Sequence, residues 1–545
     1  MRSNLVPRPL TMLLLAAVAA PFVACGDVGG GGGGGVSDTL GGDTAAGEDS
    51  LGSDTAEDVQ IGDDTGDDTA DSSVGDDATP GDTVEPGDTA GPGDTAAPED
   101  TGGPDDTAGP GDVADTTIAP DPCDNGAQDG DETDVDCGGS CGPCASGEAC
   151  GDAADCATGI CDEDVCVAWR ATSLSVGRTH ACAVVQGGRI VCWGDNRRGQ
   201  CGVDPAGGAT TVRPGYVGGA DFAGFTQVAA GYEHTCAVRE GQVHCWGDNT
   251  RGQLGRVTAG DLDAAPAVVP RTGLASGQEW SAALVAAGRR HTCALVAVPQ
   301  KPSQAMCWGD DALGQMGRFG PSEAGAAPEG PREVLKTNAT TLTGVDFIVQ
   351  AGSDHACTIA YVTDAAQISR AAVQCWGGNA MGQIGETAGP KARPVIVSYY
   401  GSFLGLSAEA DSTCWVKETT ATTSHVTCVG VIPAENDAPS ATPVQLETWS
   451  DAQDVAVDAT MVCAVRGEAR TVECLGSAQT NGYSQTAPTA IGGFDGPVAG
   501  LDAGDRFACG LQEDGAVRCW GTDTMGQLGD GGGAGSPATA LRMSP

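Results

Sequence analysis

Residues 231–255 read GYEHTCAVREGQVHCWGDNTRGQLG, and this stretch decides the fold because the chain repeats it. Close copies occupy four other ranges, 177–202, 288–317, 352–385 and 504–529. Two divergent copies lie between 352–385 and 504–529, around Cys414 and around Cys463. A repeat of this length cannot bury its apolar face alone, so the seven copies are expected to pack against one another in a single array.

Each copy predicts four short strands. An apolar strand ending in Gly comes first, as in QVAAG, and two strands joined by a hairpin follow at the HxC and CWG segments. A Pro-led strand, as in APAVVP, comes after GQLG. Four short strands with Gly and Pro at the turns are typical of a propeller blade. Residues 167–545 are therefore expected to form an all-β, seven-bladed β-propeller, whose ring the divergent fifth and sixth copies still complete.

The quoted motif resembles the regulator of chromosome condensation repeat. The matching positions in the second copy are Gly231, His234, Val238, Gly241, Val243, Trp246, Gly247, Asn249, Gly252, Gln253, Leu254 and Gly255. The resemblance covers roughly residues 169–545 and implies a seven-bladed propeller in which this His makes structural hydrogen bonds. Relatives in that family act as exchange factors for small GTPases, as photoreceptors and as a secreted β-lactamase inhibitor, each through a face of the propeller.

Two sets of equivalent side chains have both a structural and a functional interpretation. The histidines are His180, His234, His291 and His355, and the tryptophans are Trp193, Trp246, Trp308, Trp376 and Trp520. The histidines suggest a metal site, and tryptophan rings bind sugars or cations. Repetition at one position in successive blades favours packing instead, because equivalent positions of a propeller converge only at its axis.

Every copy also carries one Cys on its second strand and one on its third. The expected pairs are Cys182 with Cys192, Cys236 with Cys245, Cys293 with Cys307, Cys357 with Cys375, Cys414 with Cys428, Cys463 with Cys474, and Cys509 with Cys519. A two-residue turn at Glu240-Gly241 places Cys236 opposite Cys245, close enough for a disulfide. Seven disulfides within blades are expected, and Cys201 remains as a buried thiol.

Residues 123–166 contain eight cysteines, which predict a separate disulfide-rich module of undetermined pairing. They are Cys123, Cys137, Cys141, Cys144, Cys150, Cys156, Cys161 and Cys166. The segment resembles a cysteine-rich module of secreted and surface proteins of myxobacteria. The Cys141-Gly-Pro-Cys144 segment also matches a thioredoxin redox pair, but no apolar strand precedes it. Calcium is the one cofactor considered, since hard cations prefer several oxygen ligands. Its candidate ligands are Asp129, Asp131, Asp134 and Asp136.

Residues 1–24 predict a lipoprotein signal peptide. A short apolar run follows Arg8, and residues 22–25 resemble a bacterial lipobox in which Cys25 is lipidated. Residues 25–122 are rich in Gly, Asp and Thr, and from 26 onward they hold 26 acidic residues and no Lys or Arg. This composition predicts a disordered, extended linker. The protein is therefore expected to be exported and lipid-anchored, at the outer membrane or cell surface of a Gram-negative bacterium.

Charge and motif content narrow the function. The formal net charge is −47, and without a basic stripe nucleic-acid binding is not expected. No catalytic motif is evident, so no catalytic residue is predicted. We expect a monomeric, non-enzymatic scaffold that binds an unknown protein or envelope ligand through a propeller face. Alternatives are a propeller lyase or hydrolase, guanine-nucleotide exchange by family analogy, and a structural envelope or adhesion protein. Specificity is expected where the copies differ, in the hairpin tips 298–304 and 361–372 and in blades five and six.

Overall fold

The computed structural model describes most of the chain from Pro122 onward. The described residues are 122–151, 155–156, 161–207, 210–219, 222–318, 330–335, 345–363, 369–387, 389–399, 401–420, 422–433, 438–476, 487–530 and 541–542. The expected signal peptide, the lipidation site at Cys25 and the linker up to residue 121 lie outside them. Within the described part of the chain, no helix has the length and apolar character needed to cross a membrane.

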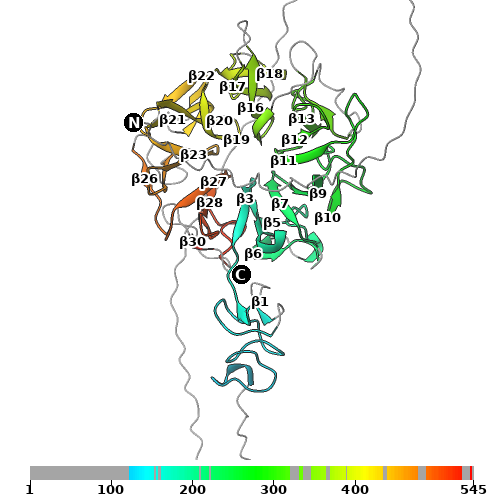
Figure 1. The fold of residues 1–545 in the computed structure, drawn as a ribbon, viewed down its shortest axis with the longest axis vertical. Helices are drawn as coiled ribbons and strands as arrows, with labels where there is room; N and C mark the ends of the chain where they lie inside the picture. Colours follow the sequence, from blue (N-terminus) through cyan, green and yellow to red (C-terminus); the bar gives the residue numbers. More distant parts are fainter. Residues whose placement is uncertain are drawn as a thin grey trace, which may run out of the picture. The chain divides into compact units, whose positions relative to one another are not determined.

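Seven four-stranded antiparallel sheets form a ring around a central axis, and this confirms the expected seven-bladed propeller (Figure 1). Blade 1 contains β3 (Ala171–Val176), β4 (His180–Val185), β5 (Arg189–Asp195) and β6 (Thr210–Tyr216). Blade 2 contains β7 (Phe225–Ala230), β8 (His234–Arg239), β9 (Gln242–Asp248) and β10 (Leu262–Val268). Blade 3 contains β11 (Ser281–Ala287), β12 (His291–Ala297), β13 (Gln304–Gly309) and β14 (Arg332–Glu333). Blade 4 contains β15 (Val345–Ala351), β16 (His355–Thr363), β17 (Ser369–Gly377) and β18 (Lys391–Ser398).

The divergent copies form complete blades as well. Blade 5 contains β19 (Ser402–Glu409), β20 (Ser412–Thr420), β21 (Thr423–Ile432) and β22 (Ala438–Leu446). Blade 6 contains β23 (Ala452–Val457), β24 (Met461–Arg466), β25 (Thr471–Gly476) and β26 (Thr489–Ala490). Blade 7 contains β27 (Val498–Gly504), β28 (Phe507–Gln512), β29 (Val517–Gly521) and β30 (Leu541–Arg542). Short 3-10 turns η3 (Gln186–Gly188) and η4 (Pro205–Gly207) interrupt blade 1.

The hairpin between the second and third strands follows from the turn residues. In blade 2, Glu240 and Gly241 take φ of 51° and 73°, as a two-residue turn between twisted strands requires at both positions. This register sets Cys236 opposite Cys245. The equivalent pair is opposed in every blade, whatever the length of the hairpin tip.

Each opposed cysteine pair is bonded in the structure, as the repeat predicts. The seven disulfides join Cys182 to Cys192, Cys236 to Cys245, Cys293 to Cys307, Cys357 to Cys375, Cys414 to Cys428, Cys463 to Cys474, and Cys509 to Cys519. Within each pair the Cα atoms lie 4.0–4.1 Å apart, the spacing of a non-hydrogen-bonded antiparallel pair. All fourteen side chains are buried, so these bonds lie in the blade interiors.

The remaining propeller cysteine is also where the repeat predicts it. Cys201 is buried, belongs to no disulfide and donates to the Asp195 carbonyl at 3.4 Å. It packs beside Val217 and Phe225. The thiol therefore takes the place of a small apolar side chain in the core between blades 1 and 2.

The ring closes without an exchanged strand. All four strands of blade 1 come from the start of the propeller, and all four of blade 7 come from its end. Their junction depends on noncovalent contacts: Trp193 Nε1 donates to the Gln527 carbonyl at 2.8 Å, and Asp505 N donates to the Arg178 carbonyl at 2.8 Å. The blade 7–blade 1 junction is therefore the point at which the ring has no covalent continuity.

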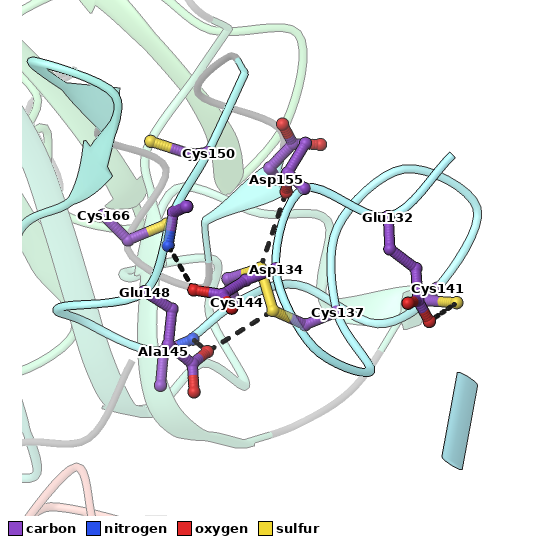
Figure 2. Close-up of a disulfide and its surroundings, with 12 residues drawn as sticks. Glu132, Asp134, Cys137, Cys141, Cys144, Ala145, Glu148, Cys150, Asp155 and Cys166 are labelled. Atoms are coloured by element: carbon purple, nitrogen blue, oxygen red, sulfur yellow. Dashed lines mark hydrogen bonds between the residues drawn. A yellow bond between two sulfur atoms is a disulfide. The ribbon is translucent and has the colours of Figure 1, made fainter. Parts of the chain in front are cut away.

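The cysteine-rich module, considered by itself, is a set of turns with one two-stranded ladder, β1 (Cys161–Asp162) and β2 (Val165–Cys166), after the 3-10 turn η1 (Pro122–Asp124). Its disulfides join Cys123 to Cys141, Cys137 to Cys144, Cys150 to Cys161 and Cys156 to Cys166. Cys141 and Cys144 are thus bonded to different partners, unlike a redox pair. Figure 2 shows the Glu148 carboxylate, which accepts from Ala145 N at 2.6 Å, beside the Cys137 sulfur.

The blade disulfides predict a loss of stability on removal. The Cys236→Ser/Cys245→Ser double variant should lower the free energy of unfolding by about 2–4 kcal/mol, because a short loop in the unfolded chain is no longer closed. Chemical denaturation without reductant measures this change. The wild-type protein is denatured in the same way, without reductant. Iodoacetamide added after this denaturation should label Cys201 and leave Cys236 and Cys245 unlabelled. Labelling of the paired cysteines would contradict the disulfide scheme.

Candidate binding site at the channel mouth

The innermost strands of the blades enclose a channel along the propeller axis. Its lining residues come from β3, β7, β11, β15, β19, β23 and β27, and the enclosed cavity measures about 310 Å³. Ser, Ala, Val, Leu and Gln dominate the lining, but three acidic side chains also face it: Glu409, Asp454 and Asp502. All three come from blades 5 to 7, so the charge lies on one side of the channel.

Five of the seven inner strands end at a glycine for a steric reason. A Cβ added to Gly177 would lie 2.1 Å from the Gly231 carbonyl oxygen of the next blade, and one on Gly504 would lie 2.0 Å from the Gly177 carbonyl oxygen. At Gly177, Gly231, Gly288 and Gly504 the backbone of the next blade approaches too closely for any side chain, and at Gly352 the His355 ring does. At the equivalent position, blades 5 and 6 carry Glu409 and Asp458. The two divergent blades therefore introduce carboxyl groups where the other five require glycine.

The residues that follow the inner strands meet at this mouth of the channel. We name the following residues the mouth cluster: Arg178, Tyr232, Arg289, Ser353, Asp354 and Glu409. The Tyr232 hydroxyl, from the end of β7, hydrogen-bonds with Ser353 and with Glu409, so the ring reaches from blade 2 to blades 4 and 5. The Arg178 guanidinium lies 5.3 Å from the centre of the same ring. Tyr232 thus connects charged groups from opposite sides of the mouth.

An ion pair completes the mouth cluster. Arg289 Nη2 donates to Asp354 Oδ1 at 2.7 Å; the Arg289 side chain is 40% exposed and that of Asp354 is 15% exposed. Nearby Asp411 accepts from Gln383 Nε2 at 2.8 Å, and burial together with Asp354 raises its pKa. Donors and acceptors from five blades are therefore available to a ligand at this mouth.

Burial changes the protonation of the acidic groups here. The pKa of Glu409 lies well above its ordinary value, first because of burial and then because of the nearby Asp502 and Asp458. Burial also raises the pKa of Asp458 to about 7, and those of Asp454 and Asp502 to about 6. Burial raises the pKa of Tyr232, so its hydroxyl remains a hydrogen-bond donor. Carboxyl groups in several protonation states are thus present near neutral pH.

The repeated histidines lie between neighbouring blades. His180 Nε2 lies 2.8 Å from Thr235 Oγ1, and Thr235 donates its own proton to the Gln200 carbonyl at 2.7 Å. Since the hydroxyl has one proton, His180 Nε2 must donate. Trp246 Nε1 donates to the same Gln200 carbonyl at 3.0 Å. A backbone carbonyl of one blade therefore accepts from both Thr and Trp of the next.

This His–Thr–Gln contact recurs at two further interfaces, and His291 is the one of the four histidines that lacks it. His234 pairs with Thr292 and His355 with Thr413, each at 2.8 Å. Blade 4 has Ala356 at the position of the Thr, and both ring nitrogens of His291 are buried without a partner among the described residues. Burial lowers the pKa of His291 to about 4, so the ring is neutral. The group of four histidines is a set of blade contacts, not a constellation around a metal.

The repeat sequence, considered with this geometry, matches a known family. The chain carries regulator of chromosome condensation (RCC1) repeats. One RCC1 repeat profile matches residues 171–200, 225–253 and 498–527, and a second matches 187–238 and 240–295. The seven blades and their interface contacts extend this repeat to copies that neither profile marks.

Curated relatives match part of this chain. The chain is 28% identical over 272 residues to the human probable E3 ubiquitin-protein ligase HERC6, covering 49% of this chain and 24% of that protein. It is 32% identical over 127 residues to the ultraviolet-B receptor UVR8 of Arabidopsis thaliana, covering 23% of this chain and 27% of that receptor. The matched segments thus span about a quarter of the length of these relatives.

Solved structures share the fold. Human WBSCR16 superposes with a TM-score of 0.53 at 18% identity, covering 66% of this chain and 94% of that one. Yeast RCC1 (Prp20), solved bound to Kap60, superposes with a TM-score of 0.50 at 17% identity, covering 66% of this chain and 84% of that one. At this level of identity the likeness extends to the architecture alone.

The four aspartates considered for calcium engage different partners in the module. Asp136 accepts from the backbone of Asn125 and Gly126, Asp131 from Ser140 Oγ at 2.7 Å, and Asp134 from Ala149 N at 2.7 Å. Asp129 accepts from Asn125 Nδ2 at 2.9 Å. Among the described residues, the groups of three closely spaced potential ligands contain none of these aspartates.

The repeat pattern predicts specificity in the fifth and sixth blades but singles out no residue of the mouth cluster. The available signal was the replacement of the strand-ending Gly by Glu409 and Asp458. Tyr232 and Arg289 carry no comparable signal, because the position after that Gly varies freely among the copies. The hairpin tip at 298–304, and the described residues 361–363 and 369–372 of the tip in blade 4, lie at the opposite ends of their strands from this mouth.

The interface of blades 3 and 4, where His291 meets Ala356 instead of a Thr, gives a prediction. Ala356→Thr should raise the free energy of unfolding by about 1 kcal/mol, because the new hydroxyl satisfies His291 and donates to the Gln315 carbonyl, which accepts from Trp376 Nε1 at 2.8 Å. The reverse change, Thr235→Ala, should lower it by about 1–3 kcal/mol, since it leaves His180 unsatisfied. Chemical denaturation of the two variants measures both changes in the free energy of unfolding. Equal destabilisation by both changes would contradict the assigned role of the hydroxyl.

Proposed function

We propose that this protein is a non-enzymatic binding scaffold that recognises a protein or ligand at the channel mouth. The observation that carries the proposal is the mouth cluster: side chains from separate blades converge on Tyr232, and they include an exposed guanidinium and carboxyl groups. Such convergence needs the closed ring, because the residues are up to 231 positions apart in the chain. RCC1-type structures support protein binding as a role for the fold: yeast Prp20 has been solved with Kap60 bound.

The polarity of the mouth indicates the kind of ligand. Arg178 and Arg289 offer donors in a planar fork, which matches carboxylates, while Asp354 and Glu409 offer acceptors beside them. A surface with both signs of charge within one small area fits a protein loop with alternating charges better than a nucleic acid, whose phosphates require a continuous basic surface. The strongly acidic composition of the whole chain supports the same preference.

A substitution in the mouth cluster tests the binding role. Arg289→Ala should weaken capture of a partner from envelope extract, and the Kd measured with the purified partner should rise about tenfold or more, since a charged hydrogen-bonding group is lost. Arg239→Ala is the matched control, because Arg239 ends β8 at the opposite end of its blade. Equal affinity of the two variants, or turnover of a small molecule without any partner, would overturn the proposal.

We also propose that the scaffold is held at a membrane through lipid on Cys25, with residues 26–122 as a spacer. The support is the lipobox-like sequence that ends at Cys25 and the charge repulsion within the acidic stretch that follows it. Metabolic labelling with palmitate in a lipoprotein-processing host should label the wild-type chain, and Cys25→Ala should abolish the label and release the protein from the membrane fraction. Labelling that persists in Cys25→Ala would refute the anchor.

A further inference from the structure

On the face that carries the mouth cluster, two loop positions of neighbouring blades meet at an interface. One is the residue before the Gly-Gln of the turn that follows the third strand. The other is the second residue after the position that ends the inner strand of the next blade. Between blades 1 and 2 these positions hold Arg198 and Glu233, whose Nε and Oε2 atoms lie 4.0 Å apart. An ion pair therefore fills this interface.

The interface between blades 3 and 4 shows the same neighbourhood with a different pair. Leu313 and Asp354 hold the two positions there. A Cβ added to Gly378 would lie 3.3 Å from Leu313 Cδ1 and 3.0 Å from Asp354 Cβ, so the two side chains flank one point. The Asp354 carboxylate bonds to Arg289. Side chains at the two positions are thus neighbours even where they form no ion pair.

Between blades 2 and 3 both positions hold arginine, Arg251 and Arg290. The backbones meet there closely: a Cβ added to Gly309 would lie 2.5 Å from the Arg290 carbonyl oxygen and 3.2 Å from Gln253 Cα. Arg251 N donates to Gln253 Oε1 at 2.9 Å, as Arg198 N does to the Gln of its own turn at 2.8 Å. Because the turns match, a pair of guanidinium groups replaces the Arg–Glu ion pair of the preceding interface.

The charge of this arginine pair is incompletely compensated. Within the described part of the chain no acid lies at ion-pair distance from Arg251 or Arg290, and both side chains are exposed. Asp310 is the neighbouring acid, since its N donates to the Arg290 carbonyl at 2.8 Å. Its Oδ1 accepts from Ala312 N at 3.1 Å, within its own loop. Two cations beside one acid leave a modest excess of positive charge.

The surroundings of the arginine pair favour a carboxylate over a row of phosphates. A guanidinium group offers a planar fork of donors that matches a carboxylate. Arg290 directly follows Arg289 of the mouth cluster, so a ligand that spans both also meets Asp354 and Asp411. These acids repel a polyanion such as a nucleic acid or an anionic membrane surface, which needs a continuous basic surface. A protein segment that carries an isolated acidic residue avoids this repulsion.

We propose that Arg251 and Arg290 bind an acidic side chain of a protein segment that occupies the channel mouth. The inference deepens the proposed binding role and rests on it. An Asp or Glu carboxylate between the two guanidinium groups accepts from both and relieves their mutual repulsion. The pair therefore fixes which part of the partner is acidic, namely the part that lies over blades 2 and 3.

A charge reversal tests the arginine pair with a defined probe. The probe is a fluorescein-labelled peptide of alternating Glu and Ala residues, titrated with the full chain at low ionic strength and followed by fluorescence anisotropy. Arg290→Glu should raise the Kd about tenfold or more, because it recreates the Arg–Glu pair of blades 1 and 2 and removes the site. Arg239→Glu changes the net charge equally at the opposite end of β8. It should leave the Kd within about twofold of the wild-type value, since distant charges contribute little.

The reciprocal change keeps the test decisive. Glu233→Arg places a second arginine opposite Arg198 and should add a second site for the peptide. Arg251→Gln takes the place of Arg290→Glu if that variant does not fold. Equal Kd values for Arg290→Glu and Arg239→Glu, or tighter binding of inorganic phosphate or anionic lipid vesicles than of the peptide, would refute the inference. Those outcomes leave the mouth proposal standing, which fails instead if Arg289→Ala retains full capture of its partner.

Discussion

The whole ring depends on satisfying backbone polar groups where two blades meet. Each sheet is covered on both faces by its neighbours, so a polar group at an interface has lost its water and needs a protein partner. The Gln carbonyl of the GQLG turn meets this requirement by accepting from Trp and Thr of the next blade, as Gln253 does from Trp308 and Thr292. The Trp ring then buries its apolar face between the two sheets. One turn thus sets both the hydrogen bonding and the packing of an interface.

The inner edge of the ring follows the same constraint with different residues. Ser, Gln and Asp side chains each cap an N–H of the next blade, and glycine ends the strand wherever the neighbouring backbone comes too near. Blades 5 and 6 depart from this pattern with Glu409 and Asp458. Those departures place acid in the channel mouth, beside a Tyr from blade 2. The features that distinguish this propeller therefore arise where the repeat is least regular.

Much of the fold was predictable from local patterns. Gly and Pro at turn positions, paired Cys and alternating apolar strands determine the blade, because each acts within one repeat of the chain. The Glu240-Gly241 turn predicts the register of Cys236 and Cys245, and the structure has that register. The pairing in the cysteine-rich module was not predictable, since eight cysteines in turns carry no strand register to select among alternatives.

The candidate site was predictable only in part. The replacement of Gly by Glu409 is visible in the sequence, whereas its neighbour Tyr232 lies 177 positions earlier and becomes a partner only when the ring closes. The same holds for the raised pKa of Asp458 and Asp502, which results from burial by strands of other blades. The sequence by itself determined the blade, its repetition and its disulfide register, because these depend on contacts a few residues apart. Tertiary structure alone decided which charged groups share the channel mouth and how the last blade meets the first, because those contacts join blades that only the closed ring brings together.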